Sequence, residues 1–248
     1  MFGFITSIPR KLKHLFSKFK PLFTKPQYEN FCRAEMGMMV AAQGEHDIKS
    51  INQLFIDRKD QSSLNRFMTK SKWNVQDIVK KGTDLLLSES ELNSEVEYKL
   101  LDDSVCRKYS PRTEMVCYNH SSTMGTVLSH DYVTSLHVNN EVAVSDGLKL
   151  YGNERKCKEK GVEFKTKEAK ALGLGEYRFR ESEAALIHAH LVSLACTLLD
   201  TLMRRLLRYS IVRGLLSFEG TVEWIRKRAM HLFMHRVRNS AEPFRSIL

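Results

Sequence analysis

Two adjacent aspartates, Asp102 and Asp103, are the residues of this 248-residue chain whose types and spacing most clearly suggest chemistry. They follow an alternating run, 98–101, which predicts a β-strand that ends in a carboxylate pair. Aspartate is a poor strand former and two neighbouring negative charges repel, so a cation between them would relieve the pair. Hard divalent ions such as magnesium prefer oxygen ligands of this kind. A solvated turn after the strand explains the same residues equally well.

Histidines are a second kind of candidate ligand. His130 falls in a predicted strand and His120 directly follows one, but neither has a second histidine at metal-ligand spacing. A polar strand residue satisfied by neighbouring backbone is therefore the better interpretation of each. His231 and His235 are four residues apart on a predicted helix, yet no carboxylate offers itself as a third ligand. The aspartate pair stays the main candidate for chemistry.

The strands of a β-rich segment must position these aspartates. Alternating apolar residues and turn signals predict four strands, over residues 95–101, 114–119, 127–138 and 142–150. We expect the first strand to pair antiparallel with the second, and the second with the third. Asn139 and Asn140 mark the turn before the fourth strand.

Three blocks of sequence, in the same order, resemble prokaryotic insertion-sequence transposases of the DDE superfamily, whose catalytic domain has an RNase H-like fold. The upstream block is 60–67, and the downstream block is 172–180. The central block contains the matching stretches Leu100–Lys108, Tyr118–Ser122, Gly125–His130 and Val133–Leu136. The resemblance implies a three-stranded antiparallel start of an RNase H-like sheet.

The resemblance also implies a site. In that family three carboxylates hold two divalent metal ions, magnesium or manganese, which activate the nucleophile and stabilise the leaving oxygen of a phosphodiester. Asp103 matches the first carboxylate, and Asp102 beside it is a second candidate metal ligand. Between residues 166 and 167 the family carries a long segment with the second aspartate and the final glutamate, so the chain resembles an internally deleted member.

One pair of residues keeps the spacing of the family's last motif. Glu163 and Lys170 are seven residues apart, as the catalytic glutamate and a lysine are in that motif. Glu163 is thus a candidate third catalytic carboxylate, although the preceding strand block explains it better. Lys170 matches the lysine of this motif better than Glu163 matches its glutamate.

Two functions remain open after this resemblance. In the first, the chain is a DDE-type transposase that binds DNA and performs magnesium-dependent cleavage and strand transfer, impaired by the deletion. In the second, it is a non-catalytic DNA-binding remnant, or an inhibitor of an intact transposase. The missing carboxylates favour the second for the actual chemistry.

Charge and composition agree with a polyanionic partner. The formal net charge is +10 and the pI is near 9.4, which suits double-stranded DNA such as insertion-sequence ends, although other basic proteins share this balance. Five scattered cysteines indicate a reduced, cytoplasmic protein, prokaryotic by the resemblance. No apolar run is long enough for a membrane span. A homodimer is left open.

The first 27 residues form a basic amphipathic arm. Its six Lys and Arg are interleaved with apolar residues at near-helical spacing, and it contains no acid. It either folds onto its own domain or stays loose, or it contacts DNA phosphates. A helix on a membrane surface is a third option.

The region 28–90 reads as helical, with a helix that ends near Gly44 and a second one over 47–57 capped by Asp47. A third starts at Asp60 or Ser62 and buries Leu64, Phe67 and Met68. Two short helices joined by a polar turn fit a helix-turn-helix-like DNA-binding unit, and they also occur in other proteins. The residues expected to contact DNA are Asn65, Arg66, Lys70 and Lys72, while Trp73 is expected in the core.

The region 167–248 reads as a C-terminal helical tail, with helices over 184–207 and 221–238. Arg226, Lys227 and Arg228 on the last helix are expected to grip phosphates, and a merely solvated face is equally consistent with them. The predicted fold is α+β: a helical domain after the arm, a partial RNase H-like antiparallel sheet over 91–166, and the helical tail.

Overall fold

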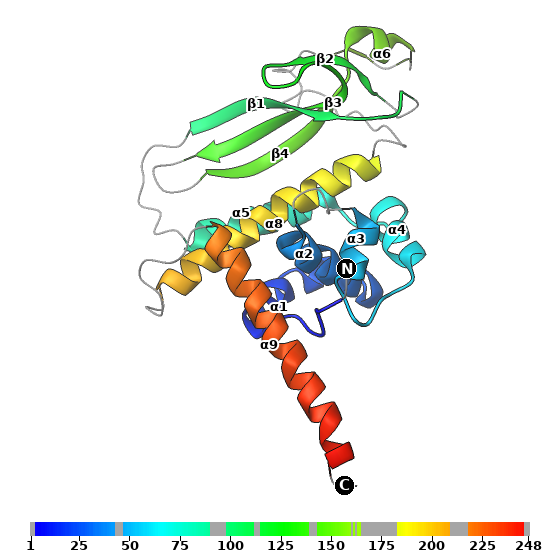
Figure 1. The fold of residues 1–248 in the computed structure, drawn as a ribbon. Coiled ribbons are helices and arrows are strands. Elements are labelled where there is room, and N and C mark those ends of the chain that lie inside the picture. The colour runs from blue at the N-terminus through cyan, green and yellow to red at the C-terminus, as the bar shows by residue number, and fades with distance from the viewer. Residues whose placement is uncertain are drawn as a thin grey trace. The chain divides into compact units, whose positions relative to one another are not determined.

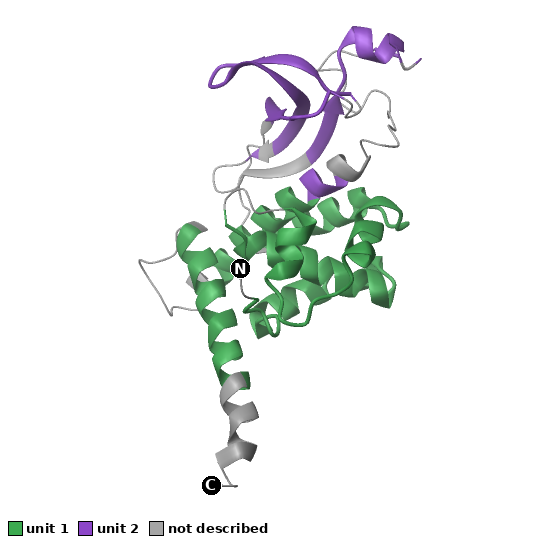
Figure 2. Ribbon diagram, turned by 45° about the vertical axis from the view of Figure 1, so that its right-hand side comes forward, with its two compact units in different colours: residues 1–89, 191–248 green, residues 90–190 purple. Residues whose placement is uncertain are grey.

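The computed structural model of the chain describes residues 3–42, 47–89, 98–111, 115–138, 143–159, 161, 163–164, 183–208 and 218–245. The chain divides into two compact units (Figure 2). Residues 1–89 and 191–248 form a helical unit, and residues 90–190 form a sheet unit. The fold therefore mixes helix and sheet as predicted, but the arm, the N-terminal helices and most of the C-terminal helices belong to one unit.

A central helix, α2, organises the helical unit (Figure 1). Proline in its first turn and a hydrogen bond of 2.9 Å from Thr24 N–H to Gln27 Oε1 begin the helix. Nearly every residue from Asn30 to Val40 is buried, so this part of the helix is covered on all sides. The elements of the first 89 residues are α1 (Arg10–Ser17), η1 (Lys20–Leu22), α2 (Lys25–Val40), α3 (Ile48–Gln53), α4 (Gln61–Thr69) and α5 (Val75–Glu89).

Aromatic rings fill the core beside α2. The Phe31 ring lies 5.2 Å from the Phe19 ring and 4.8 Å from the Phe23 ring, between ring centroids. Trp73 stacks on Phe67 at 5.1 Å, and its indole N–H donates to the Phe67 carbonyl over 3.0 Å. Trp73 is half-buried and packs against the core, as predicted. Each buried ring of this kind contributes about 1.5–3 kcal/mol of transfer free energy.

The arm belongs to this core. Leu12, Leu15 and Phe16 of α1 are fully buried, while the Lys and Arg residues of the helix face solvent. A membrane-surface helix would need this apolar face to be free, but the face packs against the chain's own core. The structure therefore favours the alternative in which the arm folds onto its own domain.

Two long helices complete the helical unit, α8 (Glu183–Arg208), of which residues 191–208 belong to it, and α9 (Phe218–Arg245). Leu191, Leu194, Leu198 and Leu202 of α8 are buried. A side chain at Gly82 of α5 would collide with Leu194, so this glycine lets α5 and α8 approach closely. No helix among the described residues is both long and apolar enough to cross a membrane.

A long strand, β3, lies at the centre of the antiparallel sheet (Figure 1). Residues 129–138 of β3 pair with β1 on one edge, and β2 and β4 follow one another along the other edge. The predicted pairing of the second strand with the third is confirmed, but the predicted pairing of the first with the second is wrong. The strands are β1 (Tyr98–Arg107), β2 (Cys117–Ser121), β3 (Gly125–Val138) and β4 (Ala143–Tyr151).

The different lengths of β2 and β3 explain why β1 pairs with β3 and not with β2. The five-residue β2 covers only the start of β3, so the rest of β3 accepts β1 and β4 on its two edges. Local alternation predicts strands but not their neighbours, because pairing partners are set by long-range contacts. The consecutive strand order expected from the RNase H-like resemblance is not confirmed.

The first strand is also longer than predicted. β1 continues through the aspartate pair to Arg107, with Asp102 opposite Thr134 and Asp103 opposite Val133. The pair therefore lies in mid-strand, and the prediction of a strand that ends there is wrong. A continuous hydrogen-bond ladder to β3 outweighs the low strand propensity of aspartate.

A small apolar cluster holds one face of the sheet. Met115, Tyr132, Leu150 and Cys157 are buried together, with Leu148 and Ala189 packed against them. Cys157 comes from the short helix α6 (Glu154–Glu159). A side chain at Gly152 would collide with the Met115 methyl group and crowd Cys157, so glycine leaves room for both where the chain leaves β4.

Candidate nucleic-acid interface

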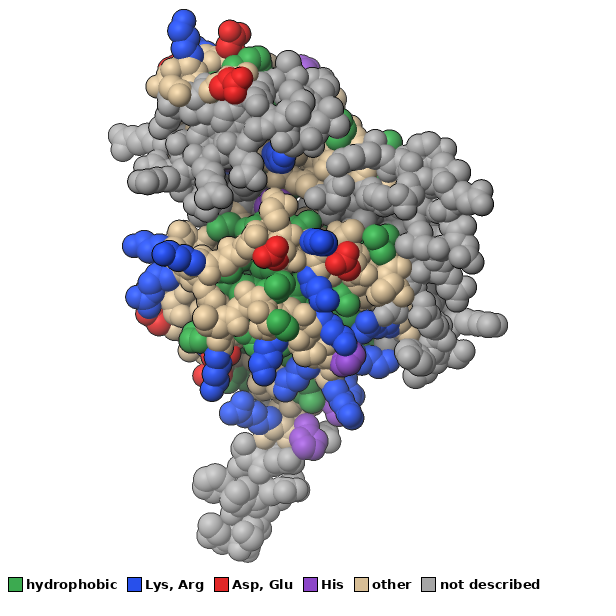
Figure 3. Space-filling model, turned by 180° about the vertical axis from the view of Figure 1, so that it is seen from behind, with side chains coloured by type: hydrophobic (Ala, Val, Ile, Leu, Met, Phe, Trp, Pro, Cys, Tyr) green, Lys and Arg blue, Asp and Glu red, His purple; other side chains and the backbone are tan. Residues whose placement is uncertain are grey.

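Positive charge is distributed unevenly between the two units. The helical unit contains 25 Lys and Arg against 13 Asp and Glu, a net charge of +12. The sheet unit contains 14 against 16, a net charge of −2. Figure 3 shows Lys and Arg side chains spread over one face of the helical unit with few acidic ones among them. The positive net charge of the chain is therefore a property of the helical unit.

Helix α4 presents a polar face next to a buried one. Asp60 caps the helix by accepting from the Ser62 N–H over 3.1 Å, as predicted. Leu64, Phe67 and Met68 are buried. At 100° per residue, the exposed polar residues all fall on the opposite arc of the helix: Gln61, Ser62, Asn65, Arg66 and Thr69.

The connection before α4 is held by a buried side chain. Asn52 of α3 donates from Nδ2 to the Lys59 carbonyl over 2.7 Å and accepts from the Lys59 N–H over 3.2 Å. Lys59 in turn pairs with Glu29 of α2 over 2.9 Å. Residues 54–60 between α3 and α4 are longer than the three or four residues of a standard helix-turn-helix. The pair is a helical hairpin with a long, fixed turn.

The residues after α4 are exposed as expected. Lys70 and Lys72 both face solvent, and the Lys72 carbonyl accepts from Gln27 Nε2 over 3.2 Å. This bond ties the end of α4 to the start of α2. Asn65, Arg66, Lys70 and Lys72 are therefore all exposed on α4 or directly after it, and Gln61 at the start of α4 is exposed too. The sequence analysis did not predict Gln61 as a contact residue. Its position directly after the Asp60 cap was the signal that could have found it.

The three basic residues predicted on α9 differ in their surroundings. Lys227 and Arg228 are exposed, and Lys227 pairs loosely with Glu223 over 3.6 Å. Arg226 instead donates from Nε and Nη2 to the Val40 carbonyl over 3.1 and 3.0 Å, and from Nη2 to the Ala41 carbonyl over 3.1 Å. Its guanidinium stabilises the negative C-terminal end of α2 rather than facing solvent.

Exposed basic residues of α1 add to the same unit. Its solvent face carries Arg10, Lys11 and Lys13, and Lys18 follows directly. No acidic residue lies in this stretch of the sequence. Because the opposite face of α1 is buried in the core, these side chains are presented on a fixed helix.

The aspartate pair does not converge on one point. Neighbouring residues of a strand point to opposite faces, so the Asp102 and Asp103 carboxylates lie on different sides of the sheet. Both residues are exposed. The Asp103 N–H donates to Asp102 Oδ1 over 2.9 Å. A shared magnesium ion does not fit this geometry.

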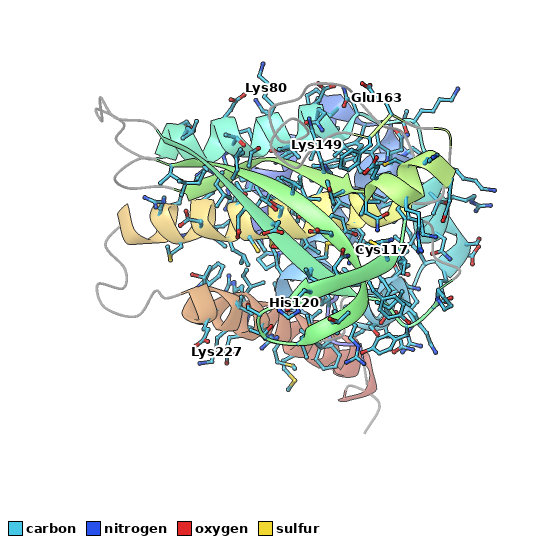
Figure 4. The ribbon with its side chains drawn as sticks, turned by 90° about the horizontal axis from the view of Figure 1, so that it is seen from above. Lys80, Cys117, His120, Lys149, Glu163 and Lys227 are labelled. Atoms are coloured by element: carbon cyan, nitrogen blue, oxygen red, sulfur yellow. The ribbon has the colours of Figure 1, made fainter. Side chains whose placement is uncertain are left out.

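Other predicted ligands are also dispersed. Glu163 is exposed in the coil after α6, and Figure 4 shows it well apart from His120 on β2. His130 is buried and lies 3.3 Å from the Tyr132 hydroxyl, which suits a structural strand residue. Among the residues that the structure describes, no group of three His, Cys, Asp or Glu could hold a metal ion. This result covers the predicted ligands Asp102, Asp103, Glu163, His231 and His235. Lys170 lies outside the described residues.

One ionisable residue inside the helical unit was not predicted from the sequence. Glu35 of α2 is fully buried, and neither carboxylate oxygen has a hydrogen-bond partner. Burial raises its pKa well above the ordinary value, so the neutral form is favoured. Burial also raises the pKa of the nearby Cys32 thiol to about 11. Glu35 lies in the core and adds nothing to the exposed basic surface.

In comparisons with known proteins, no family model matches the chain, and no curated protein or solved structure matches it either.

Proposed function

We propose that the helical unit binds double-stranded DNA and that the chain is a non-catalytic remnant, or an inhibitor, of a DDE-type transposase. The observation that carries the binding half is the charge partition: the helical unit has a net charge of +12 and the sheet unit −2. The transposase half rests on the sequence resemblance alone, which also gives insertion-sequence ends as the proposed DNA.

Helix α4 supports contacts with base edges. Glutamine and asparagine side chains pair in a bidentate way with adenine, and arginine pairs with guanine, in the major groove. Gln61, Asn65 and Arg66 offer both kinds of contact on one exposed helix face. The exposed Lys and Arg of α1 and α9 supply the phosphate contacts that give affinity without sequence preference.

The aspartate geometry supports binding without cleavage. Two-metal phosphoryl chemistry needs carboxylates that hold both ions about 3.5–4 Å apart. Asp102 and Asp103 point to opposite faces of β1, and Glu163 does not join either of them in a three-residue group. We therefore expect the chain to occupy DNA ends without cutting them.

A DNA titration tests the binding half. Fluorescence anisotropy with a labelled duplex, at several salt concentrations, compares the natural chain with the double variant Lys227→Ala/Arg228→Ala. Loss of two phosphate contacts should weaken binding and reduce the slope of log affinity against log salt by about 2. The matched control, Arg155→Ala/Lys158→Ala, removes the same charge from exposed positions of the sheet unit and should leave the slope unchanged. Equal effects of the two variants would contradict the assignment to the helical unit.

A nicking assay tests the catalytic half. Supercoiled plasmid carrying candidate ends is incubated with the protein and magnesium or manganese, and no metal-dependent nicking is expected. If nicking occurs, and Asp103→Ala and Glu163→Ala each abolish it, then the chain is an active transposase and the non-catalytic proposal fails.

A further inference from the structure

One face of strand β2 exposes two ring side chains. The residues of β2 alternate in burial, so that Cys117 is buried while Tyr118 and His120 are exposed. Tyr118 is 72% exposed, although a tyrosine ring gains stability from burial against other side chains. Because side chains two residues apart on a strand point to the same face, both rings lie on one face of the sheet.

The hairpin between β2 and β3 fixes these two rings. Ser121 pairs with Gly125, which has a φ of 67° that glycine adopts without strain. Within the turn, Ser121 Oγ accepts from the Thr123 and Met124 N–H groups over 3.4 Å each. Both rings are therefore presented by a closed hairpin with a defined register.

Positive charge accompanies the rings, although the sheet unit as a whole is slightly acidic. The Lys108 N–H donates to the Leu128 carbonyl over 2.7 Å, and Leu128 pairs with Tyr118 on its other side. Lys108 and Tyr118 therefore flank the same residue of β3, about 10 Å apart across the sheet. Residues 104–130 contain three Lys and Arg and one acid, so this part of the sheet unit is locally basic.

The spacing of the two rings favours one form of nucleic acid. Residues i and i+2 of a strand are about 6.8 Å apart, which is twice the step of about 3.4 Å between stacked bases. A single strand can open its stack to this spacing and place a base against each ring, whereas a duplex would have to unpair. Exposed aromatic side chains on a sheet stack the bases of single strands in this way, and basic side chains beside them hold the phosphates.

We propose that this face of the sheet unit binds single-stranded DNA, with bases stacked on Tyr118 and His120 and a phosphate held by Lys108. Stacking needs no particular sequence, because every base has a flat aromatic face. The choice of DNA over RNA rests on the proposed function, in which the helical unit holds duplex DNA. The single-stranded site belongs to the other unit and uses none of the residues proposed to contact the duplex.

The test is fluorescence anisotropy of the full chain with labelled oligothymidine at several salt concentrations. Tyr118→Thr keeps a strand-forming residue but removes the ring, so it should weaken binding about tenfold without changing the salt dependence. Tyr118→Phe keeps the ring and should bind like the natural chain. Lys108→Ala should reduce the slope of log affinity against log salt by about 0.7, because one phosphate contact with a single strand is lost.

Tyr109→Thr is the matched control. Tyr109 is 87% exposed, but it lies beyond the end of β1 with the Arg107 guanidinium 5.2 Å from its ring centroid. This variant should bind oligothymidine like the natural chain. The proposal is overturned if Tyr118→Thr and Tyr109→Thr bind oligothymidine equally well, or if Tyr118→Thr weakens binding of oligouridine alone.

Duplex binding is a separate readout of the same variants. Tyr118→Thr should leave the affinity for duplex DNA unchanged. A chain that binds no duplex, yet loses oligothymidine on Tyr118→Thr, contradicts the proposed function and supports the single-stranded site. A chain that binds duplex, yet keeps its full oligothymidine affinity on Tyr118→Thr, contradicts only the single-stranded site.

Discussion

The helical unit and the sheet unit differ in both charge and core. The helical unit carries a net charge of +12 and a core of fully buried rings around α2, whereas the sheet unit is close to neutral and is held by a small cluster around Met115 and Tyr132. The contrast teaches that the exposed basic side chains of the helical unit are held on a rigid support, because the large core fixes the helices that carry them. Asp102 and Asp103, the carboxylates that suggested chemistry, belong to the sheet unit and lie on β1.

The largest expected effect concerns the two cores. Phe31→Ala should lower the free energy of unfolding of the helical unit by about 3–5 kcal/mol, because the fully buried ring leaves a cavity among its aromatic neighbours. Urea denaturation followed by tryptophan fluorescence measures it, since Trp73 lies in the same cluster. Leu150→Ala makes the corresponding cavity in the sheet unit. If both variants shift a single transition equally, the two units unfold as one and the comparison between them fails.

A smaller effect separates support from contact on α9. Arg226→Ala should lower the free energy of unfolding by about 2 kcal/mol, because two carbonyls at the end of α2 lose charged hydrogen bonds. Lys227→Ala should change stability by less than about 0.5 kcal/mol and instead weaken DNA binding. Thermal unfolding together with DNA titration measures both quantities. A stable Arg226→Ala protein with reduced DNA affinity would show that this guanidinium contacts phosphate after all.

Base discrimination by α4 should change by about 1–3 kcal/mol. Arg66→Ala or Asn65→Ala should reduce the preference for a selected duplex over an unrelated one, because base-edge hydrogen bonds are lost. Competition binding with the two duplexes measures the ratio of affinities. Lys70→Ala is the matched comparison, since loss of a phosphate contact weakens binding to both duplexes alike. A uniform loss in all three variants would remove base reading from α4.

The last expected effect is confined to the core of the helical unit and depends on pH. Burial raises the folded-state pKa of Glu35, so the unfolded chain releases this proton first as pH rises above the ordinary value of 4.5. The free energy of unfolding should therefore fall as pH rises from there toward the folded-state pKa. Glu35→Gln lacks this fall, so its stability relative to the natural chain should be unchanged at acid pH and greater near neutrality. Urea unfolding midpoints of the natural chain and of Glu35→Gln, measured at several pH values, test this. If the two midpoints change with pH in parallel, Glu35 does not have a raised pKa in the folded state.

Local patterns in the sequence were sufficient for much of the helical unit. Asp47 and Asp60 as caps, with apolar residues three and four apart, predict α3 and α4, and the structure confirms both caps and the buried face of α4. Helix α3 ends at Gln53, however, and not at residue 57 as predicted. The helices over 184–207 and 221–238 are confirmed within a longer α8 and α9. Helix α2 ends at Val40 rather than near Gly44. These features depend on side chains within one or two turns of each other.

Alone, the sequence determined the basic balance, the helices, the existence of four strands and the exposed polar face of α4, because each of these follows from local spacing or from composition. Only the tertiary structure decided that β3 lies between β1 and β4, that Arg226 caps α2, and that 12 net positive charges gather in one unit. It also decided that Asp102 and Asp103 diverge in mid-strand. The physical reason is that strand neighbours, helix contacts and the direction of a side chain depend on residues far away in the chain, which no local pattern encodes.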